Sequence, residues 1–209
     1  MHAGILAFPA SEILFSISGC QRNMERATEM IKDFNLIATT DKINESRACS
    51  ELWMLLKAAG DESPAVDRSF IRGIVVGRTS VTPDAVAGRL SMDLRSNPKN
   101  YNSLYRVIPV QRIVETSTEK IVESAKGLAT VMRPGDSFRV AFEKRRIGLS
   151  SHEIIDAVAS HFEQRVDLEN PDWVILIETM GKITGVSVVK PSQIVNVQKT
   201  RFSLSTEKT

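Results

Sequence analysis

Alternating apolar and polar residues along the chain are interspersed with stretches whose apolar residues recur every three or four positions. The second pattern predicts amphipathic helices at residues 22–33, 45–59, 83–97, 117–132 and 150–162. The first pattern, rich in β-branched residues, predicts strands at residues 34–40, 69–81, 104–116, 138–143, 173–180 and 185–191. This order predicts an α/β fold (α+β) in which helices pack on sheets, in two compact halves.

Capping and proline signals mark several of these boundaries. Asn44 is a plausible N-cap of its helix and Gly60 closes it. Thr82 is the expected N-cap of the next helix, with Pro83 in its first turn. Pro109 interrupts the run 104–116 and therefore predicts an edge strand or a bulge there.

Turn-forming residues separate the predicted elements. Residues 60–67 read as a loop by composition, and residues 69–81 as a bent strand or a pair about Gly73. The connector 96–103 is rich in turn residues and is a candidate hinge between the halves. The polar tail 201–209 is expected to be frayed.

Composition predicts a soluble globular protein. Hydrophobic residues make up 42% of the chain and charged residues 25%, and no apolar run reaches the roughly 18 to 20 residues of a membrane helix. The N-terminus lacks a basic stretch before its apolar residues and is interrupted by Pro9 and Glu12, which argues against a signal peptide. Cys20 and Cys49 are too few for a disulfide framework, so we expect reduced thiols and a cytoplasmic location.

Catalytic and cofactor motifs are not found in the sequence. It contains no glycine-rich nucleotide-binding motif and no G-x-S-x-G nucleophile elbow. His152 and His161 lack further ligands at metal-binding spacing, and Cys49 lies in an apolar helix typical of an inert buried thiol. Asp167, Glu169 and Asp172 belong to turn chemistry. We therefore expect no catalytic residue, no metal, no cofactor and no enzymatic activity.

Positive charge is concentrated in one quarter of the chain. Residues 99–149 hold 10 basic and 5 acidic residues, whereas residues 1–98 hold 11 and 12, and residues 150–209 hold 6 and 8. A clustered positive field attracts polyanions more than evenly mixed charge does. Such an excess also arises on ordinary solvated faces, so charge alone leaves both interpretations open.

The stretch Phe138–Glu143 runs into Lys144, Arg145 and Arg146, and Ser150 with Glu153 then forms a capping-box pattern. Because a helix N-terminus offers free N–H groups and partial positive charge, three cations beside it would make a phosphate site. The alternative is a solubilising strand end and an ordinary cap. The same half contributes further candidate cations, Arg106, Arg112, Lys126, Arg133 and Arg139. Its aromatic residues are few, and Phe138, Phe142 and Phe162 fall on core faces, so the patch suits phosphates and structured RNA more than splayed bases.

Several segments together resemble the THUMP domain. They are "YRVIPVQRIVET", "FRVAFEKRR" followed by the Ser-capped "SSHEIIDAVASHF", "VDLENPDWVILIET" and "GVSVV". The resemblance divides the chain into an extension (1–33), a ferredoxin-like domain (34–98), a THUMP domain (99–198) and a tail (199–209).

The resemblance implies binding of tRNA, at its acceptor end, during tRNA modification. Because the chain ends soon after the last predicted strand, we expect no fused catalytic domain, which is similar to stand-alone members that assist an acetyltransferase in making N4-acetylcytidine. The resemblance assigns RNA contact to Arg106, Arg112, Lys144, Arg145 and Arg146, and leaves Asn170, Pro171 and Asp172 as turn residues. Replacing Lys144, Arg145 and Arg146 with alanine is then expected to remove tRNA retention with little change in the thermal melt.

Two other function classes remain open at this stage. One is a small RNA-modifying enzyme whose site is not recognised, and the other is a protein-interaction domain whose basic face meets an acidic partner. A steep loss of tRNA affinity with rising salt concentration would favour phosphate binding over an unrecognised enzymatic site. Competition between tRNA and the partner would test the second.

Overall fold

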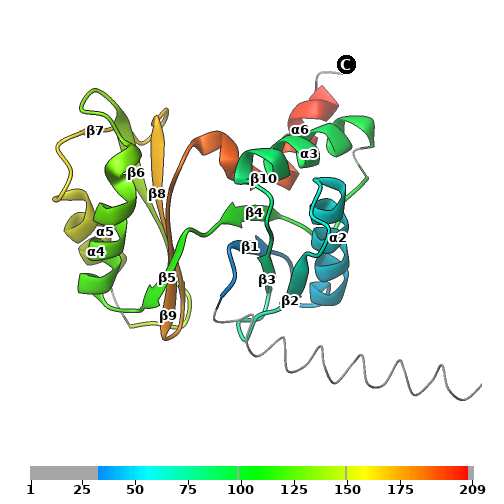
Figure 1. Cartoon of the computed structure of the whole chain (residues 1–209), viewed down its shortest axis with the longest axis horizontal. Helices are drawn as coiled ribbons and strands as arrows, with labels where there is room; N and C mark the ends of the chain where they lie inside the picture. The colour runs from blue at the N-terminus through cyan, green and yellow to red at the C-terminus, as the bar shows by residue number, and fades with distance from the viewer. Residues whose placement is uncertain (1–32, 98, 149, 207–209) are drawn as a thin grey trace, which may run out of the picture.

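The computed structural model of the protein describes residues 33–206 apart from residues 98 and 149 (Figure 1). The predicted helix 22–33 and the predicted extension 1–33 lie outside the described residues, except for Asp33. The described chain forms two five-stranded sheets with helices on their outer faces, which confirms the predicted α/β fold class. Within this part of the chain, every helix is too short or too polar to span a membrane.

The first sheet is antiparallel, with strand order β10-β4-β1-β3-β2. Its N-terminal elements follow one another as β1 (Leu36–Thr39), α2 (Glu45–Ala58), β2 (Ala65–Arg68), β3 (Ile74–Arg78), α3 (Pro83–Ser96) and β4 (Arg106–Pro109). This is the βαββαβ order of ferredoxin-like folds. It supports the predicted ferredoxin-like assignment, which stays a prediction.

The second sheet is mixed, with strand order β5-β9-β8-β6-β7. Strand β6 runs parallel to both β7 and β8, whereas β9 pairs antiparallel with β5 and β8. The elements are β5 (Arg112–Glu115), α4 (Thr118–Leu128), η1 (Ala129–Val131), β6 (Ser137–Glu143), α5 (Ser151–Ala159), β7 (Arg165–Val166), β8 (Trp173–Met180) and β9 (Ile183–Val189). The chain then returns to the first sheet through η2 (Pro191–Gln193) and β10 (Val195–Asn196), and ends in α6 (Val197–Thr206).

The two sheets pack face to face, so the molecule has four layers (Figure 1). Helices α2 and α3 cover the outer face of the first sheet, and α4 and α5 cover the outer face of the second. The middle core joins residues such as Ile37 and Ile108 of the first sheet to Leu176 and Val189 of the second. Burial of these side chains fixes the sheets against one another, which positions the polar residues at the edge of the same interface.

The local signals for helix ends are mostly confirmed. The Thr82 hydroxyl accepts a hydrogen bond from the Ala85 N–H at 3.3 Å, and Pro83 lies in the first turn of α3. Gly60 has a φ of 105°, the left-handed conformation that closes a helix at low cost. Asn44 occupies the N-cap position of α2, but its side chain donates to Asp41 instead of capping the helix.

Three predictions about connecting segments are wrong. The expected loop 60–67 contains most of β2, which pairs with β3 across a turn holding Gly73. The expected frayed tail forms α6 as far as Thr206. The connector 96–103 joins α3 to β4 of the same sheet, and the chain instead crosses between sheets at Val110 and Gln111. The first and third errors concern strand pairing and the path of the chain, which short-range composition does not encode. In the second, a polar segment was expected to be frayed but forms a helix.

The run 104–116 splits at Pro109 into β4 and β5, which belong to different sheets. Strands β4 and β10, both placed in the THUMP part by the predicted boundary between residues 98 and 99, complete the first sheet. The predicted domain boundaries stay a prediction. The chain passes from the first sheet to the second at Val110 and Gln111, not at residues 98 and 99.

Candidate nucleic-acid interface

The loop that follows β6 carries the three consecutive cations and is held to the β8–β9 hairpin. The Arg145 N–H donates to the Thr179 hydroxyl at 2.9 Å, and the Gly181 N–H donates to the Arg145 carbonyl at 3.2 Å. Arg146 has a φ of 53°, so the chain turns sharply there. The Ser150 hydroxyl then accepts from the Glu153 N–H at 3.5 Å, which confirms the predicted N-cap of α5.

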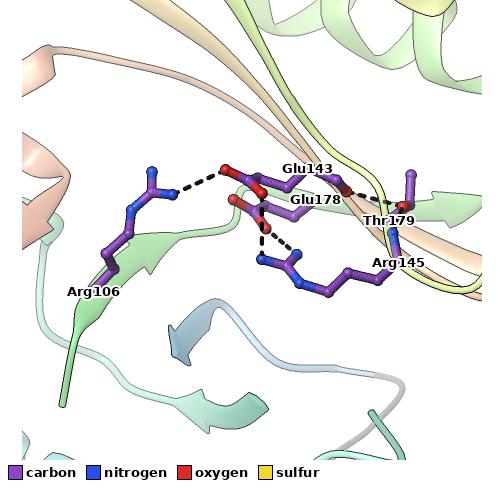
Figure 2. A network of polar contacts seen from close by, with 5 residues as sticks. All are labelled: Arg106, Glu143, Arg145, Glu178 and Thr179. Carbon is purple, nitrogen blue, oxygen red and sulfur yellow. Dashed lines mark hydrogen bonds and ion pairs between the residues drawn. The ribbon is translucent and has the colours of Figure 1, made fainter. Parts of the chain in front are cut away.

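The three cations of this loop do not share one role. Lys144 and Arg146 are exposed, and neither forms an ion pair with another described residue. Arg145 turns inward, between the sheets, and pairs with the Glu178 carboxylate of β8 (Figure 2). The exposed fraction is 18% for the Arg145 side chain and 1% for that of Glu178.

The Glu143 carboxylate links the two arginines of this region, and that of Glu178 pairs with Arg145 (Figure 2). Glu143 accepts a hydrogen bond from Arg106 of β4 at 3.1 Å, and a second Glu143 oxygen lies 3.9 Å from the Arg145 guanidinium. The network therefore ties the first sheet to the second and to the loop. It also compensates much of the charge of Arg106 and Arg145, which the sequence treats as free phosphate ligands.

Burial is the main influence on the Glu178 carboxyl. It raises the pKa of Glu178 because the charged form loses its hydration, while Arg145 opposes the shift by pairing with that form. Removing Arg145 would leave an uncompensated buried charge. The expected alanine variant of Lys144, Arg145 and Arg146 would therefore not keep its thermal melt, which corrects the prediction made from the sequence.

A cleft of about 530 Å³ opens where the edges of the two sheets meet. Three cations line it, namely Arg106 from β4, Arg139 from β6 and Lys199 from α6. One carboxylate, that of Glu169, is also in its wall. Two of the predicted phosphate ligands, Arg106 and Arg139, thus come together in a cleft that neither sheet forms alone.

The remaining walls of the cleft carry amides and apolar side chains. Asn170 and Asn196 bring carboxamides, each of which can donate and accept hydrogen bonds. Pro171, Pro191 and Ile194 form the apolar part. Cations beside amides and apolar side chains are groups that suit the phosphate and base of a nucleotide.

Arg139, like Arg89 and Arg201, has a buried donor that lacks a hydrogen-bond partner within the part of the chain that the structure describes, so this feature is not specific to the cleft. In Arg139 this donor is the Nε atom. A buried donor left unpaired costs about 1–3 kcal/mol, so an acceptor that reaches it is stabilised. A phosphate oxygen is such an acceptor, and it forms charge-assisted bonds with guanidinium groups.

Arg112 and Lys126 lie away from the cleft. Arg112 is at the start of β5, the edge of the second sheet opposite to β7, and its guanidinium packs against Gly127 of α4. Lys126 is exposed in the same turn of α4, and Arg133 is exposed just beyond η1. The predicted cations therefore fall into three groups: the exposed loop, the space between the sheets, and the α4 side.

Sequence reasoning missed Lys199, Asn170, Pro171 and Asn196 as cleft residues. Asn170 and Pro171 were assigned only to turn geometry, and Lys199 to the tail 199–209. The short alternation at Val195 and Asn196 is the signal that could have indicated a strand there, because Val195 is buried and Asn196 exposed.

Residues 115–189 match the family model of the THUMP domain. The chain contains a THUMP domain. The match begins at Glu115, the last residue of β5, and ends with β9, so it covers the rest of the second sheet with its helices, and the four-layer arrangement places the THUMP domain against the first sheet. No curated protein matches the chain.

Solved structures share the fold well beyond the THUMP domain. PH1313 from Pyrococcus horikoshii Ot3 is 22% identical over 76% of this chain and 55% of its own, with a TM-score of 0.50. TrmN from Thermus thermophilus is 18% identical over 77% of this chain and 47% of its own, also with a TM-score of 0.50. A 4-thiouridine synthetase in complex with RNA and ATP is 15% identical over 78% of this chain and 42% of its own, with a TM-score of 0.44. The chain spans about half the length of these proteins.

The comparisons contradict the prediction that the protein is not an enzyme. The chain matches only 55% of PH1313 and 47% of TrmN, so these proteins extend well beyond the part that shares its fold. The prediction rested on motifs missing from this sequence, which say nothing of the parts of PH1313 and TrmN that the chain does not match. The lack of a catalytic motif here is therefore no ground for placing the protein outside the enzymes.

Proposed function

We propose that the protein binds tRNA during tRNA modification, in the cytoplasm, and brings the acceptor end of the tRNA to a modifying active site. The observation that carries the proposal is the cleft between the two sheets, where Arg139 and Lys199 converge with Arg106, which is paired with Glu143, beside a THUMP domain. A tRNA cytidine N4-acetyltransferase is one candidate for the enzyme that supplies the active site.

In this proposal the cleft and the exposed loop act on different phosphates. Arg139 and Lys144 are separated by five residues, roughly 16 Å if strand geometry continued between them, so they can contact separate positions of one RNA backbone. Lys144 and Arg146 supply exposed charge, which attracts and orients the RNA. The cleft supplies geometry, because its cations come from three elements whose spacing the core fixes.

The test is direct binding of mature tRNA to the full chain, measured by fluorescence anisotropy at several salt concentrations. The double variant Arg139→Ala with Lys199→Ala is expected to bind at least tenfold more weakly than the parent protein. Each neutralised phosphate releases counterions. The plot of log affinity against log salt concentration should therefore be less steep for the variant, by about one unit of slope for each phosphate that it no longer neutralises.

Arg68→Ala is the matched control. Arg68 is an exposed cation of β2, at the opposite edge of the first sheet from β10. Its replacement removes the same type of charge without touching the cleft, so it is expected to change the affinity by less than twofold. Equal weakening by the control and by the cleft variant would show that only net charge matters, which would refute the role of the cleft.

A further inference from the structure

One end of the first sheet meets one end of the second, and the loops of both sheets gather there. In the first sheet, β1 ends where β3 and β4 begin, because Thr39 is the register partner of both Ile74 and Arg106. In the second sheet, the parallel strands β6 and β8 end together, and β9 begins beside them. The ion pair between Arg106 and Glu143 joins these two ends.

Four of these loops contact one another. The ring of Phe70, in the β2–β3 turn, lies 3.5 Å from the position that a Cβ would take on Gly181, in the β8–β9 turn. The Gly181 N–H in turn donates to the Arg145 carbonyl, in the loop after β6. The corresponding Cβ position on Gly73, in the β2–β3 turn, lies 4.0 Å from the side chain of Lys42, in the β1–α2 loop. Residues 40–44, 69–73, 144–146 and 181–182 therefore form one surface, here called the loop surface.

Exposed cations come from all four loops. They are Lys42, Arg72, Lys144, Arg146 and Lys182. Within the described part of the chain, none of them forms an ion pair. Cations without a carboxylate partner keep their field, which attracts a polyanion.

The carboxylates near these cations are mostly held by other groups. Asp41 and Glu45 accept hydrogen bonds from backbone N–H groups of the same loops, and Glu143 and Glu178 pair with arginines. Glu115, at the end of β5 and opposite the start of β9, is exposed at the rim. The loop surface therefore keeps an excess of positive charge.

Phe70 gives this charged surface an aromatic face. Its exposed fraction is 45%, and its ring packs against the turn that also carries Lys182. An exposed aromatic ring among cations is the arrangement that binds unpaired nucleotides, because the ring stacks on a base while the cations neutralise the neighbouring phosphates. A regular duplex would use the cations alone, since its bases are already stacked on one another.

We propose that the loop surface binds an unpaired segment of tRNA, with one base stacked on Phe70 and the adjoining phosphates on Lys42, Arg72 and Lys182. This inference rests on the proposed function and deepens it, since the same RNA would also enter the cleft. It adds RNA contacts from residues 1–98, which hold 11 basic and 12 acidic residues and therefore show no excess of positive charge in the sequence.

The phosphate contacts are tested by fluorescence anisotropy with labelled mature tRNA and the full chain. Lys42→Ala with Arg72→Ala is expected to weaken binding at least fivefold. The plot of log affinity against log salt concentration should become less steep by about two units, one for each phosphate no longer neutralised.

The matched control is Lys57→Ala with Arg68→Ala, which also removes one lysine and one arginine from the first sheet and its helices. Lys57 lies in the last turn of α2, whereas the Lys42 loop precedes the first turn. Arg68 shares with Val66 the face of β2 that turns toward α2. The control is expected to change the affinity by less than twofold, and weakening equal to that of the loop variant would overturn the proposal.

The stacking contact is tested by three replacements of Phe70. Phe70→Leu keeps an apolar side chain against Gly181 but loses the aromatic face, so tRNA binding is expected to weaken about tenfold, as does Phe70→Ala. The slope against salt concentration should stay unchanged, because the ring carries no charge. Phe70→Trp should bind as the parent protein does. Parent-like affinity of Phe70→Leu, with its Tm unchanged, would refute the stacking contact.

The variant Arg139→Ala with Lys199→Ala separates this proposal from the role of the cleft. Absence of tRNA binding by the parent protein would overturn both. Weakening by the cleft variant alone would overturn only the loop surface, and weakening by the loop variants alone would overturn only the cleft. Unchanged tRNA affinity in the loop variants, together with loss of a protein complex, would assign the surface to a protein partner and would also overturn the proposal.

Discussion

Replacing Arg145 with alanine tests whether this residue is structural or an RNA ligand. Its guanidinium pairs with the Glu178 carboxylate, whose side chain is 1% exposed, and lies 3.9 Å from Glu143. The variant leaves Glu178 without its main counter-charge in the space between the sheets. The expected result is a loss of folding stability, not a simple loss of binding.

The magnitude follows from the burial of the pair. Removing one partner of a buried ion pair costs about 3–5 kcal/mol. Because the Arg145 side chain keeps some contact with solvent, we expect the lower end, about 3 kcal/mol. For a chain of this size, that loss corresponds to a fall in Tm of about 6–12 °C.

The loss of folding stability in Arg145→Ala should depend on pH. Burial raises the pKa of Glu178 above its usual value, Arg145 and Arg106 lower it, and Glu143 raises it. In Arg145→Ala the pKa of Glu178 rises further, so the folded state binds a proton more tightly than the unfolded state does. The stability that protonated Glu178 provides is present below its unfolded pKa and is lost as pH rises through the folded pKa. Arg145→Ala should therefore lower the free energy of unfolding more at pH 8 than at pH 5.

The assay is thermal unfolding of four proteins at both pH values: the parent, Arg145→Ala, Glu178→Gln and the double variant. In the double variant, the amide removes the buried charge, so Tm at pH 8 is expected to recover part of the loss. A cost of Arg145→Ala that is the same at both pH values, with no recovery in the double variant, would refute the assignment of Arg145 to charge compensation.

Three further changes follow from the structure. Lys144→Ala with Arg146→Ala should weaken tRNA binding and flatten its salt dependence while leaving Tm unchanged, and a fall in Tm would show a structural role for this loop. Gly73→Ala should lower stability by about 1 kcal/mol in urea unfolding, because Gly73 has a φ of 82° and a Cβ there would lie 3.0 Å from the Thr40 carbonyl oxygen. The control Gly88→Ala, in α3 with open space around it, should raise stability by a similar amount, and the opposite order would contradict the backbone argument. Hydrogen bonds, first from the Ser137 N–H and then from its hydroxyl, lower the pKa of Asp172, so its stabilisation is present above its unfolded pKa and lost as pH falls through the folded one. Asp172→Asn should therefore lower Tm more at pH 7 than at pH 3, and an equal shift would argue against this linkage.

Individual helices and strands could largely be predicted from the sequence because their signals are local. Thr82 and Pro83 mark the start of α3 through a hydroxyl cap and a fixed φ, both of which act within one turn. The alternation in β6 is equally local, and Phe138 is fully buried as the pattern indicates. Such features depend on neighbours a few residues away.

The candidate site could be predicted only in part because its geometry depends on long-range pairing. Arg145 appears in the sequence as one of three equivalent cations, and its partner Glu178 lies on another strand. Arg106 and Lys199 meet in the cleft only because β10 returns to pair with β4. Local charge density identified the basic region, but strand pairing decides which of its cations face solvent, a buried carboxylate or the cleft.

The central claim, that the protein binds tRNA, is tested most directly by sequencing the RNA cross-linked to the full chain in its own cells. We predict enrichment of mature tRNA, with the cross-linked positions concentrated in the acceptor end. The variant Arg139→Ala with Lys199→Ala should lose that enrichment, whereas Arg68→Ala should keep it. Enrichment of messenger RNA, or equal recovery of tRNA by the parent and the cleft variant, would contradict the account.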